Sequence, residues 1–304
     1  MLRDLIDFAD MSKSEWDAMF SLALEIERNP AEYAEIAKGK ILASMFYEPS
    51  TRTKFSFQSA MLRLGGNIIG FDGTSATSVS KGESVKDTAR IVSSYADIIV
   101  VRSPVKGTAE EIANQSDVPV INAGDGTHLH PTQTMVDLFT IGYLTHSHEI
   151  TGKKIGICGD LLYGRTVHSL LSALAWYGNN EYYFISSPSL EVPQEYADKL
   201  VPRNKINITR SLDCIDELDI LYMTRIQKER FPSEADYLRE KGAYVLNRET
   251  LSRAKDDLII LHPLPRNDEL AEDIDDDPRA KYFLQAKLGV PLRMALIATL
   301  LGKI

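Results

Sequence analysis

The chain has 304 residues, of which 44% are hydrophobic and 25% are charged, and its formal net charge is −9. This length allows two domains with substantial cores, and the composition is typical of a globular protein in water. The negative charge argues against non-specific binding to nucleic acid, although it does not exclude a local basic pocket for an anionic substrate.

The ends and cysteines of the chain exclude further classes. The N-terminal stretch carries acidic residues among its apolar ones and does not resemble a signal peptide, and no apolar run reaches membrane-spanning length. We therefore expect no membrane partner. Two cysteines, Cys158 and Cys214, offer neither a disulfide framework nor a Cys-rich zinc site, so a reduced, cytoplasmic setting is expected.

Short apolar runs alternate with helical patterns through the first part of the chain. Strands are predicted at 41–47, 67–71, 97–102 and 118–122, and helices at 13–27, 51–64 and 84–95. The strands are apolar on both faces, which is typical of parallel sheets covered by helices.

The second part of the chain shows the same alternation. Strands are predicted at 153–159, 181–186, 219–223, 243–246 and 258–261, and helices at 134–145, 164–177 and from Pro291 to Gly302. We predict an α/β fold of two domains, each a parallel sheet covered by helices. Residues 1–131 form the first domain and 132–287 the second, and the C-terminal helix, 288–304, packs back onto the first.

Two polar segments stand out from this pattern. The Gly/Ser/Thr-rich loop at 72–84 is longer than most connections, and loops of that kind are often functional or mobile. The acidic run at 268–277 is predicted to be a solvated surface segment.

Hydrogen-bond donors follow nearly every predicted strand, where ligands bind in open α/β sheets. In chain order they are Ser50, Thr51, Arg52, Thr53, Arg102, His128, His130, Thr132, Gln133, Arg165, His168, Arg225, Gln227, Lys228, His262 and Arg266. The first four lie at a predicted helix start, where free N–H groups and the helix dipole attract anions. The repetition predicts a site for a ligand with several negative charges.

Three other kinds of site fit the sequence less well. Gly156, Gly159 and Gly164 lack the spacing of a dinucleotide-binding loop, and no P-loop motif occurs. His128 and His130 are candidate metal ligands, but no third ligand at convincing spacing accompanies them. We therefore expect no metal.

Five motifs occur in order: STRT (50–53), HPTQ (130–133), YGRTVHS (163–169), TRIQKER (224–230) and LHPLPR (261–266). Over essentially the whole chain they resemble the aspartate/ornithine carbamoyltransferase family, and within it the catalytic chains that use aspartate. Pro263 stands where the ornithine enzymes usually carry Cys, and their Ser-Met-Gly loop is not found. Lys54 replaces the usual Arg, and the 72–84 loop is one residue shorter than in some relatives, so its phosphate-binding serine is either Ser78 or Ser80.

The resemblance implies an activity. It is the transfer of the carbamoyl group of carbamoyl phosphate to the amine of L-aspartate, which gives N-carbamoyl-L-aspartate and phosphate in pyrimidine synthesis. The first domain would bind carbamoyl phosphate and the second aspartate, and no cofactor is implied. The alternatives are a catalytically silent homologue that binds an anionic metabolite or partner, and a carbamoyltransferase with another amino-acid acceptor.

The resemblance also implies residue roles. The phosphate would be bound by Ser50, Thr51, Arg52 and Thr53, the carbonyl oxygen by Thr53, Arg102 and His130, the carbamoyl NH₂ by Gln133 and the carbonyls of Leu264 and Pro265, and the aspartate carboxylates by Arg165, Arg225 and Gln227. The family has a cis bond at the position of Leu264-Pro265. Its members form cyclic homotrimers in which the lysine matching Lys81 reaches the neighbour's site and contacts phosphate and aspartate. Whether separate regulatory chains attach is left open.

Overall fold

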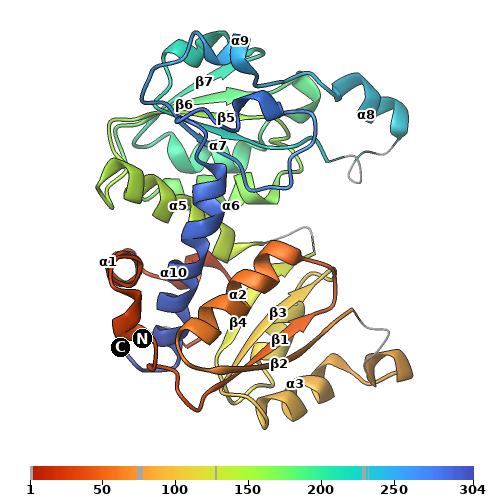
Figure 1. Cartoon of the computed structure of the whole chain (residues 1–304). Helices are drawn as coiled ribbons and strands as arrows, with labels where there is room; N and C mark the ends of the chain where they lie inside the picture. Colours follow the sequence, from red (N-terminus) through yellow and green to blue (C-terminus); the bar gives the residue numbers. More distant parts are fainter. Residues whose placement is uncertain (1–2, 74–77, 127–128, 228–230, 232) are drawn as a thin grey trace. The chain divides into compact units, whose positions relative to one another are not determined.

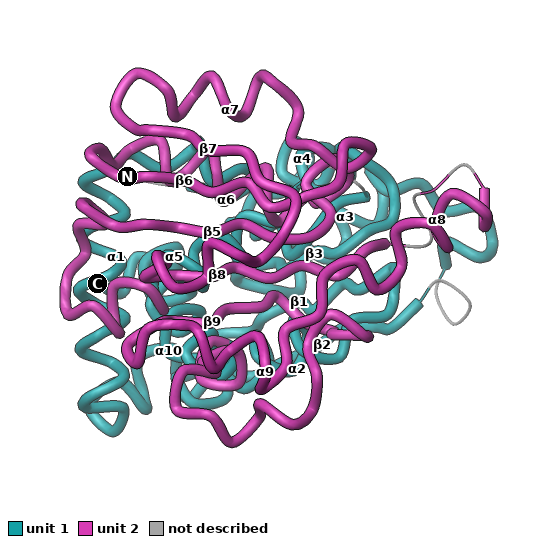
Figure 2. The backbone as a smooth tube through the Cα atoms, turned by 90° about the horizontal axis from the view of Figure 1, so that it is seen from above, with its two compact units in different colours: residues 1–139, 286–304 teal, residues 140–285 magenta. Residues whose placement is uncertain are grey.

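The computed structural model describes residues 3–73, 78–126, 129–227, 231 and 233–304. His128 and Lys228 lie outside the described residues, as do positions 74–77 of the long polar loop. The chain divides into two compact units, residues 1–139 with 286–304 (unit 1) and residues 140–285 (unit 2), shown in Figure 2. These limits fall inside helices α5 (Pro131–Thr145) and α10 (Tyr282–Leu300), whereas the sequence analysis placed them at 131 and 287. No loop marks them, because each helix continues through its limit.

Unit 1 is built on a four-stranded parallel sheet with the order β2-β1-β3-β4 (Figure 1). Its strands are β1 (Ile41–Phe46), β2 (Asn67–Asp72), β3 (Ile98–Ser103) and β4 (Val120–Asp125). Its further helices are α1 (Lys13–Arg28), α2 (Thr51–Arg63), α3 (Val85–Ser93) and α4 (Thr108–Ala113), with 3₁₀ turns at Phe8–Asp10, Pro30–Tyr33 and Ser78–Lys81.

The sheet of unit 1 is covered on both faces. Ala43 and Met45 of β1 pack in one cluster with Ala89 of α3. Side chains alternate along a strand, so Leu42 and Phe46 point to the opposite face, and both are fully buried there. This burial explains why β1 is apolar at nearly every position.

Unit 2 carries a five-stranded parallel sheet with the order β7-β6-β5-β8-β9. Its strands are β5 (Lys154–Cys158), β6 (Glu181–Ile185), β7 (Lys205–Thr209), β8 (Ile220–Met223) and β9 (Ile259–Leu261). Its helices are α6 (Arg165–Leu174), α7 (Gln194–Leu200), α8 (Glu234–Glu240) and α9 (Arg248–Leu251), with 3₁₀ turns at Pro188–Leu190, Leu212–Asp216 and Glu272–Ile274. The predicted fold class, two parallel sheets covered by helices, is confirmed.

One strand predicted from the sequence is not part of the sheet, and one strand of the sheet was not predicted. The segment 243–246 is not a strand of the sheet, although Leu246 forms an isolated bridge with Leu270. Its apolar residues signal burial, because Tyr244 and Leu246 pack in the core of unit 2. Strand β7 was missed: it is an edge strand in which polar and apolar residues alternate, so it contains no continuous apolar run.

The last helix is longer than predicted. It begins at Tyr282, and Pro291 lies inside it rather than at its start. Tyr282, Leu288 and Leu292 are buried, and this packing outweighs the backbone hydrogen bond that proline cannot make. α10 is also long and apolar enough to cross a membrane, but 61% of its most apolar 18 residues is buried inside the protein, as in the core helix of a globular protein.

Candidate functional site

The start of α2 presents several donors at the carboxyl end of β1. Ser50 occupies the N-cap position, but its side chain makes no capping hydrogen bond. Thr51 and Arg52 are exposed in the first turn, whereas Thr53 is buried. A structural cap would use the Ser50 hydroxyl on its own helix. The hydroxyl and the first N–H groups of α2 are therefore suited to an anion.

Two arginines and a histidine gather at the same edge of the unit 1 sheet. Nη1 of Arg102 lies 3.5 Å from Nε2 of His130 and 3.4 Å from the carbonyl oxygen of Ala123. Nε of Arg102 donates to Glu48 at 2.8 Å. Although Arg52 is exposed in part, partial desolvation of its guanidinium and the nearby charge of Arg102 together lower its pKa. An anion placed here would relieve that repulsion between like charges.

Gly124 is a part of this cluster that the sequence analysis missed. It has a φ of +122°, and a Cβ on it would lie 3.3 Å from Nη1 of Arg102 and 3.7 Å from Cδ2 of His130. Its N–H donates to Oδ1 of Asn122 at 2.8 Å. Glycine is therefore needed for both the backbone conformation and the close approach of the two side chains. The only sequence signal was a glycine-rich segment after a strand.

Lys54 is paired within unit 1, whereas the predicted residues of the long polar loop are exposed. Lys54 forms an ion pair with Asp72 at the end of β2. Ser78, Ser80 and Lys81 lie in one exposed 3₁₀ turn, so the structure brings the two candidate serines and the lysine together without choosing between the serines.

Gln133 lies in the first turn of α5, which directly follows His130. Its Nε2 donates to Oδ1 of Asp137 at 2.7 Å, and Asp137 is fully buried. Sequence reasoning missed Asp137: the predicted helix, 134–145, began after Gln133, whereas α5 begins at Pro131 and places both residues, four apart, on one face.

In unit 2, the predicted donors follow β5 and β8, which are neighbours in the sheet. Arg165 is the first residue of α6, and Arg225 and Gln227 come soon after β8. Nε2 of Gln227 donates to the carbonyl oxygen of Tyr163 at 3.2 Å, which links the two connections. The sheet thus brings these residues to one edge of unit 2.

Asp160 holds these two connections in place. Its carboxylate accepts a hydrogen bond from the backbone N–H of Tyr163 at 2.8 Å and another from Gln227 at 3.4 Å. Its own N–H donates to Oγ1 of Thr224 at 3.1 Å. Asp160 is fully buried, and the sequence analysis did not identify it.

The loop after β9 contains a cis peptide bond between Leu264 and Pro265, which confirms that prediction. Nδ1 of His262 accepts from the N–H of Leu264 at 2.8 Å, so its Nε2 carries the proton and donates to Glu269 at 2.8 Å. Burial, the largest single cause, raises the pKa of the Glu269 carboxyl, but the interactions with His262 and with the backbone N–H of Asn267 together outweigh burial and leave the pKa below its usual value.

The acidic run at 268–277 is therefore not a simple solvated segment, which corrects the prediction. Glu269 and Ile274 are buried, and Asp275 forms a bidentate ion pair with Arg266 that includes a contact of 2.7 Å. Arg266, a candidate ligand donor in the sequence, is thus engaged with its own chain. Glu269 and Asp275 of this run thus bind His262 and Arg266, which are the two ends of the 262–266 loop.

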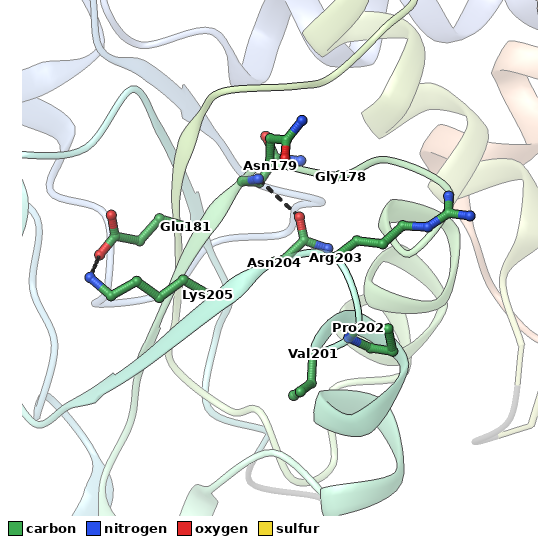
Figure 3. A pocket seen from close by; sticks show the side chains of 9 residues that line it. Gly178, Asn179, Glu181, Val201, Pro202, Arg203, Asn204 and Lys205 are labelled. Carbon is green, nitrogen blue, oxygen red and sulfur yellow. Dashed lines mark hydrogen bonds and ion pairs between the residues drawn. The ribbon is translucent and has the colours of Figure 1, made fainter.

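A hollow of about 840 Å³ in unit 2 lies elsewhere. It is lined around the amino-terminal ends of β6 and β7, the edge of the sheet opposite Arg165. Figure 3 shows that Lys205 points to Glu181, and the two form an ion pair of 2.6 Å. This hollow contains none of the residues that the motifs single out.

Comparison with known proteins agrees with the motifs. Residues 3–142 match the carbamoyl-P binding domain and residues 151–300 the Asp/Orn binding domain of aspartate/ornithine carbamoyltransferase. The aspartate carbamoyltransferase catalytic subunit of Alkaliphilus oremlandii is 51% identical, covering 99% of this chain and 92% of its own length.

Solved structures show the same similarity. The catalytic subunit of M. jannaschii aspartate transcarbamoylase is 46% identical with a TM-score of 0.91, and the match covers 99% of this chain and 98% of that one. Aspartate transcarbamoylase from Trypanosoma cruzi, solved with carbamoyl phosphate and aspartate, is 34% identical with a TM-score of 0.91, covering 98% and 96%. Both units are thus matched by these relatives over nearly their whole length, and the chain belongs to the aspartate/ornithine carbamoyltransferase family.

Proposed function

We propose that this chain is an aspartate carbamoyltransferase. It transfers the carbamoyl group of carbamoyl phosphate to the α-amine of L-aspartate and releases phosphate. The observation that carries the proposal is the cluster of Arg102, His130 and Arg52 beside the start of α2, which concentrates positive charge and donors where an anion would bind. A relative whose sequence is 51% identical to this chain carries this name. A relative of known structure was solved in complex with both substrates.

Carbamoyl phosphate would bind to unit 1. The phosphate accepts hydrogen bonds from Ser50, Thr51 and the first N–H groups of α2, and Arg52 supplies charge. Arg102 and His130, whose nitrogen atoms are 3.5 Å apart, donate with Thr53 to the carbonyl oxygen. Negative charge builds on that oxygen during attack, so these donors stabilise the transition state more than the ground state.

Aspartate would be held by unit 2. Arg165 and Arg225 pair with its two carboxylates and Gln227 adds a hydrogen bond. Two guanidinium groups disfavour an acceptor with a cationic side chain, such as ornithine. The neutral α-amine attacks the carbonyl carbon, the bond from that carbon to the phosphate oxygen breaks, and the leaving phosphate takes the amine proton. Gln133 and the carbonyls of Leu264 and Pro265 would hold the carbamoyl NH₂ during this step.

The acceptor assignment is tested with purified protein, carbamoyl phosphate and either aspartate or ornithine. We expect phosphate release that depends on aspartate, with one N-carbamoyl-L-aspartate formed for each phosphate. Faster turnover of ornithine would reject the acceptor. Binding of carbamoyl phosphate without transfer to any amino acid would instead identify a silent homologue.

We also propose that the chain assembles as a homotrimer with shared sites, in a cytoplasmic setting where it serves pyrimidine synthesis. Exposed apolar side chains on unit 1 support assembly: Phe55 and Leu62 of α2 are 59% and 60% exposed, and Ile69 of the edge strand β2 is 39% exposed. Lys81 is exposed in the turn that leads from β2 toward α3, where it is accessible to a neighbouring chain. The mass of the native complex tests the trimer and reveals any attached regulatory chains.

A further inference from the structure

A fully buried carboxylate lies one helical turn beyond Gln133. Asp137 accepts a hydrogen bond of 2.7 Å from Nε2 of Gln133, and no part of its side chain reaches the surface. Buried carboxylates are costly unless they are paired, so a specific reason for this one is expected. The transfer mechanism above gives it no role.

The chemistry of the two groups determines how the amide is turned. A carboxamide has a donor end and an acceptor end, and its two orientations are nearly equal in shape. An ionised carboxylate accepts hydrogen bonds and cannot donate one. Asp137 therefore favours the orientation with Nε2 toward itself, which leaves Oε1 of Gln133 as the end that can accept a hydrogen bond from a ligand NH₂.

A buried arginine favours the ionised form of Asp137. Arg293 of α10 is 5% exposed, and its Nη1 donates to the carbonyl oxygen of Gly289 at 3.0 Å. A Cβ at Gly289 would lie 2.3 Å from that nitrogen, so a side chain there would force the guanidinium to move. Burial lowers the pKa of Arg293 to about 10, and the negative charge of Asp137 acts against this shift. Each charge thus favours the other in the core of unit 1.

Arg293 also connects this pair to the helix that carries the anion-binding motif. Its guanidinium lies over the ring of Phe57, with 4.9 Å between the guanidinium carbon and the ring centroid. Phe57 is fully buried in α2, about one helical turn after Thr53 and about two turns after Ser50. Three helices, α2, α5 and α10, thus meet at one buried cation.

We propose that Asp137, supported by Arg293, is a positioning residue that sets the orientation of the Gln133 amide and so allows the site to select the NH₂ group of carbamoyl phosphate. The inference rests on the proposed function for the identity of that ligand. The competing explanation is an ordinary helix pair four residues apart that contributes to stability alone.

Acetyl phosphate separates the two explanations, because it carries a methyl group where carbamoyl phosphate carries NH₂. The experiment measures the dissociation constants of both compounds by calorimetry. In Asp137→Asn the residue is neutral and offers both a donor and an acceptor, so the Gln133 amide is free to turn. We expect the preference for carbamoyl phosphate over acetyl phosphate to fall by about 10-fold, the size of one hydrogen bond, while acetyl phosphate binds nearly as before.

Asp125→Asn is the matched control. Asp125 is also a buried carboxylate of unit 1, but it accepts from the N–H groups of Gly107 and Leu129. A general structural disturbance there should weaken both ligands in parallel. Gln133→Ala should lose the preference as well, and adding Asp137→Asn to it should cause no further loss, because the two residues act as one unit.

An unchanged preference in folded Asp137→Asn would overturn the inference, as would equal weakening of both ligands. If that variant does not fold, neutron diffraction from deuterated wild-type crystals reads the same property directly. Deuterium on the amide nitrogen of Gln133 should point to Asp137, and the opposite orientation would overturn the inference. A wild-type protein that prefers carbamoyl phosphate but does not carbamoylate aspartate would reject the proposed function and leave this inference standing.

Discussion

Gly124 offers a direct test of how closely the structure controls the site. In Gly124→Ala the new Cβ would lie 3.3 Å from Nη1 of Arg102, so that nitrogen must move by a few tenths of an ångström. Arg102 is held by Glu48 at 2.8 Å and lies 3.5 Å from His130, so the movement disturbs its position as a donor. A misplacement of about 1 Å lowers rates about 10²-fold, so we expect kcat to fall by about 10-fold.

The backbone adds a separate effect on stability. A side chain at a φ of +122° is strained, and such strain costs about 1–3 kcal/mol. Gly39→Ala is the matched control, because Gly39 has a φ of +78° and nothing lies within 4 Å of its added Cβ. Both variants should lose free energy of unfolding in urea titrations, but only Gly124→Ala should lose kcat at saturating substrates. If the Gly124→Ala protein turned over at the wild-type rate, the close approach to Arg102 would have no catalytic importance.

Three further predictions follow from the same geometry. His130→Ala should lower kcat by about 10²–10³-fold through loss of one donor to the carbonyl oxygen, while calorimetry shows carbamoyl phosphate binding within a modest factor; a variant that unfolds would favour a structural role. The lowered pKa of Glu269 stabilises the fold above its unfolded value of 4.5, and this contribution is lost as the pH falls. Urea titrations of Glu269→Gln should therefore show a shallower loss of stability below pH 4.5 than the wild type, and a parallel loss would contradict this reasoning. Lys81→Ala and Arg52→Ala should each be nearly inactive, but chains dissociated and reassembled together should recover activity at about one site in three of a mixed trimer. Absence of recovery on mixing would argue that Lys81 serves its own chain.

The sequence by itself determined the fold class and much of the candidate site. Burial on both faces makes the strands of parallel sheets apolar throughout, so β1, β3, β5 and β8 are visible as short apolar runs. Because parallel strands end at one edge, residues at or after their carboxyl ends gather there, as Arg102 and His130 do. This argument needs the order of elements along the chain and no knowledge of contacts.

Only the tertiary structure decided how individual side chains are paired. Arg102 ends one predicted strand and Arg266 follows another, yet Arg266 pairs with Asp275, whereas Arg102 pairs with Glu48 and also lies beside His130. Local pattern does not distinguish the two, because the partner of a charged side chain depends on which distant segments fold against it. The same reason explains why Gly124 and Asp137 were missed: one is defined by the space that a neighbouring strand's arginine occupies, and the other by a buried cation from the far end of the chain.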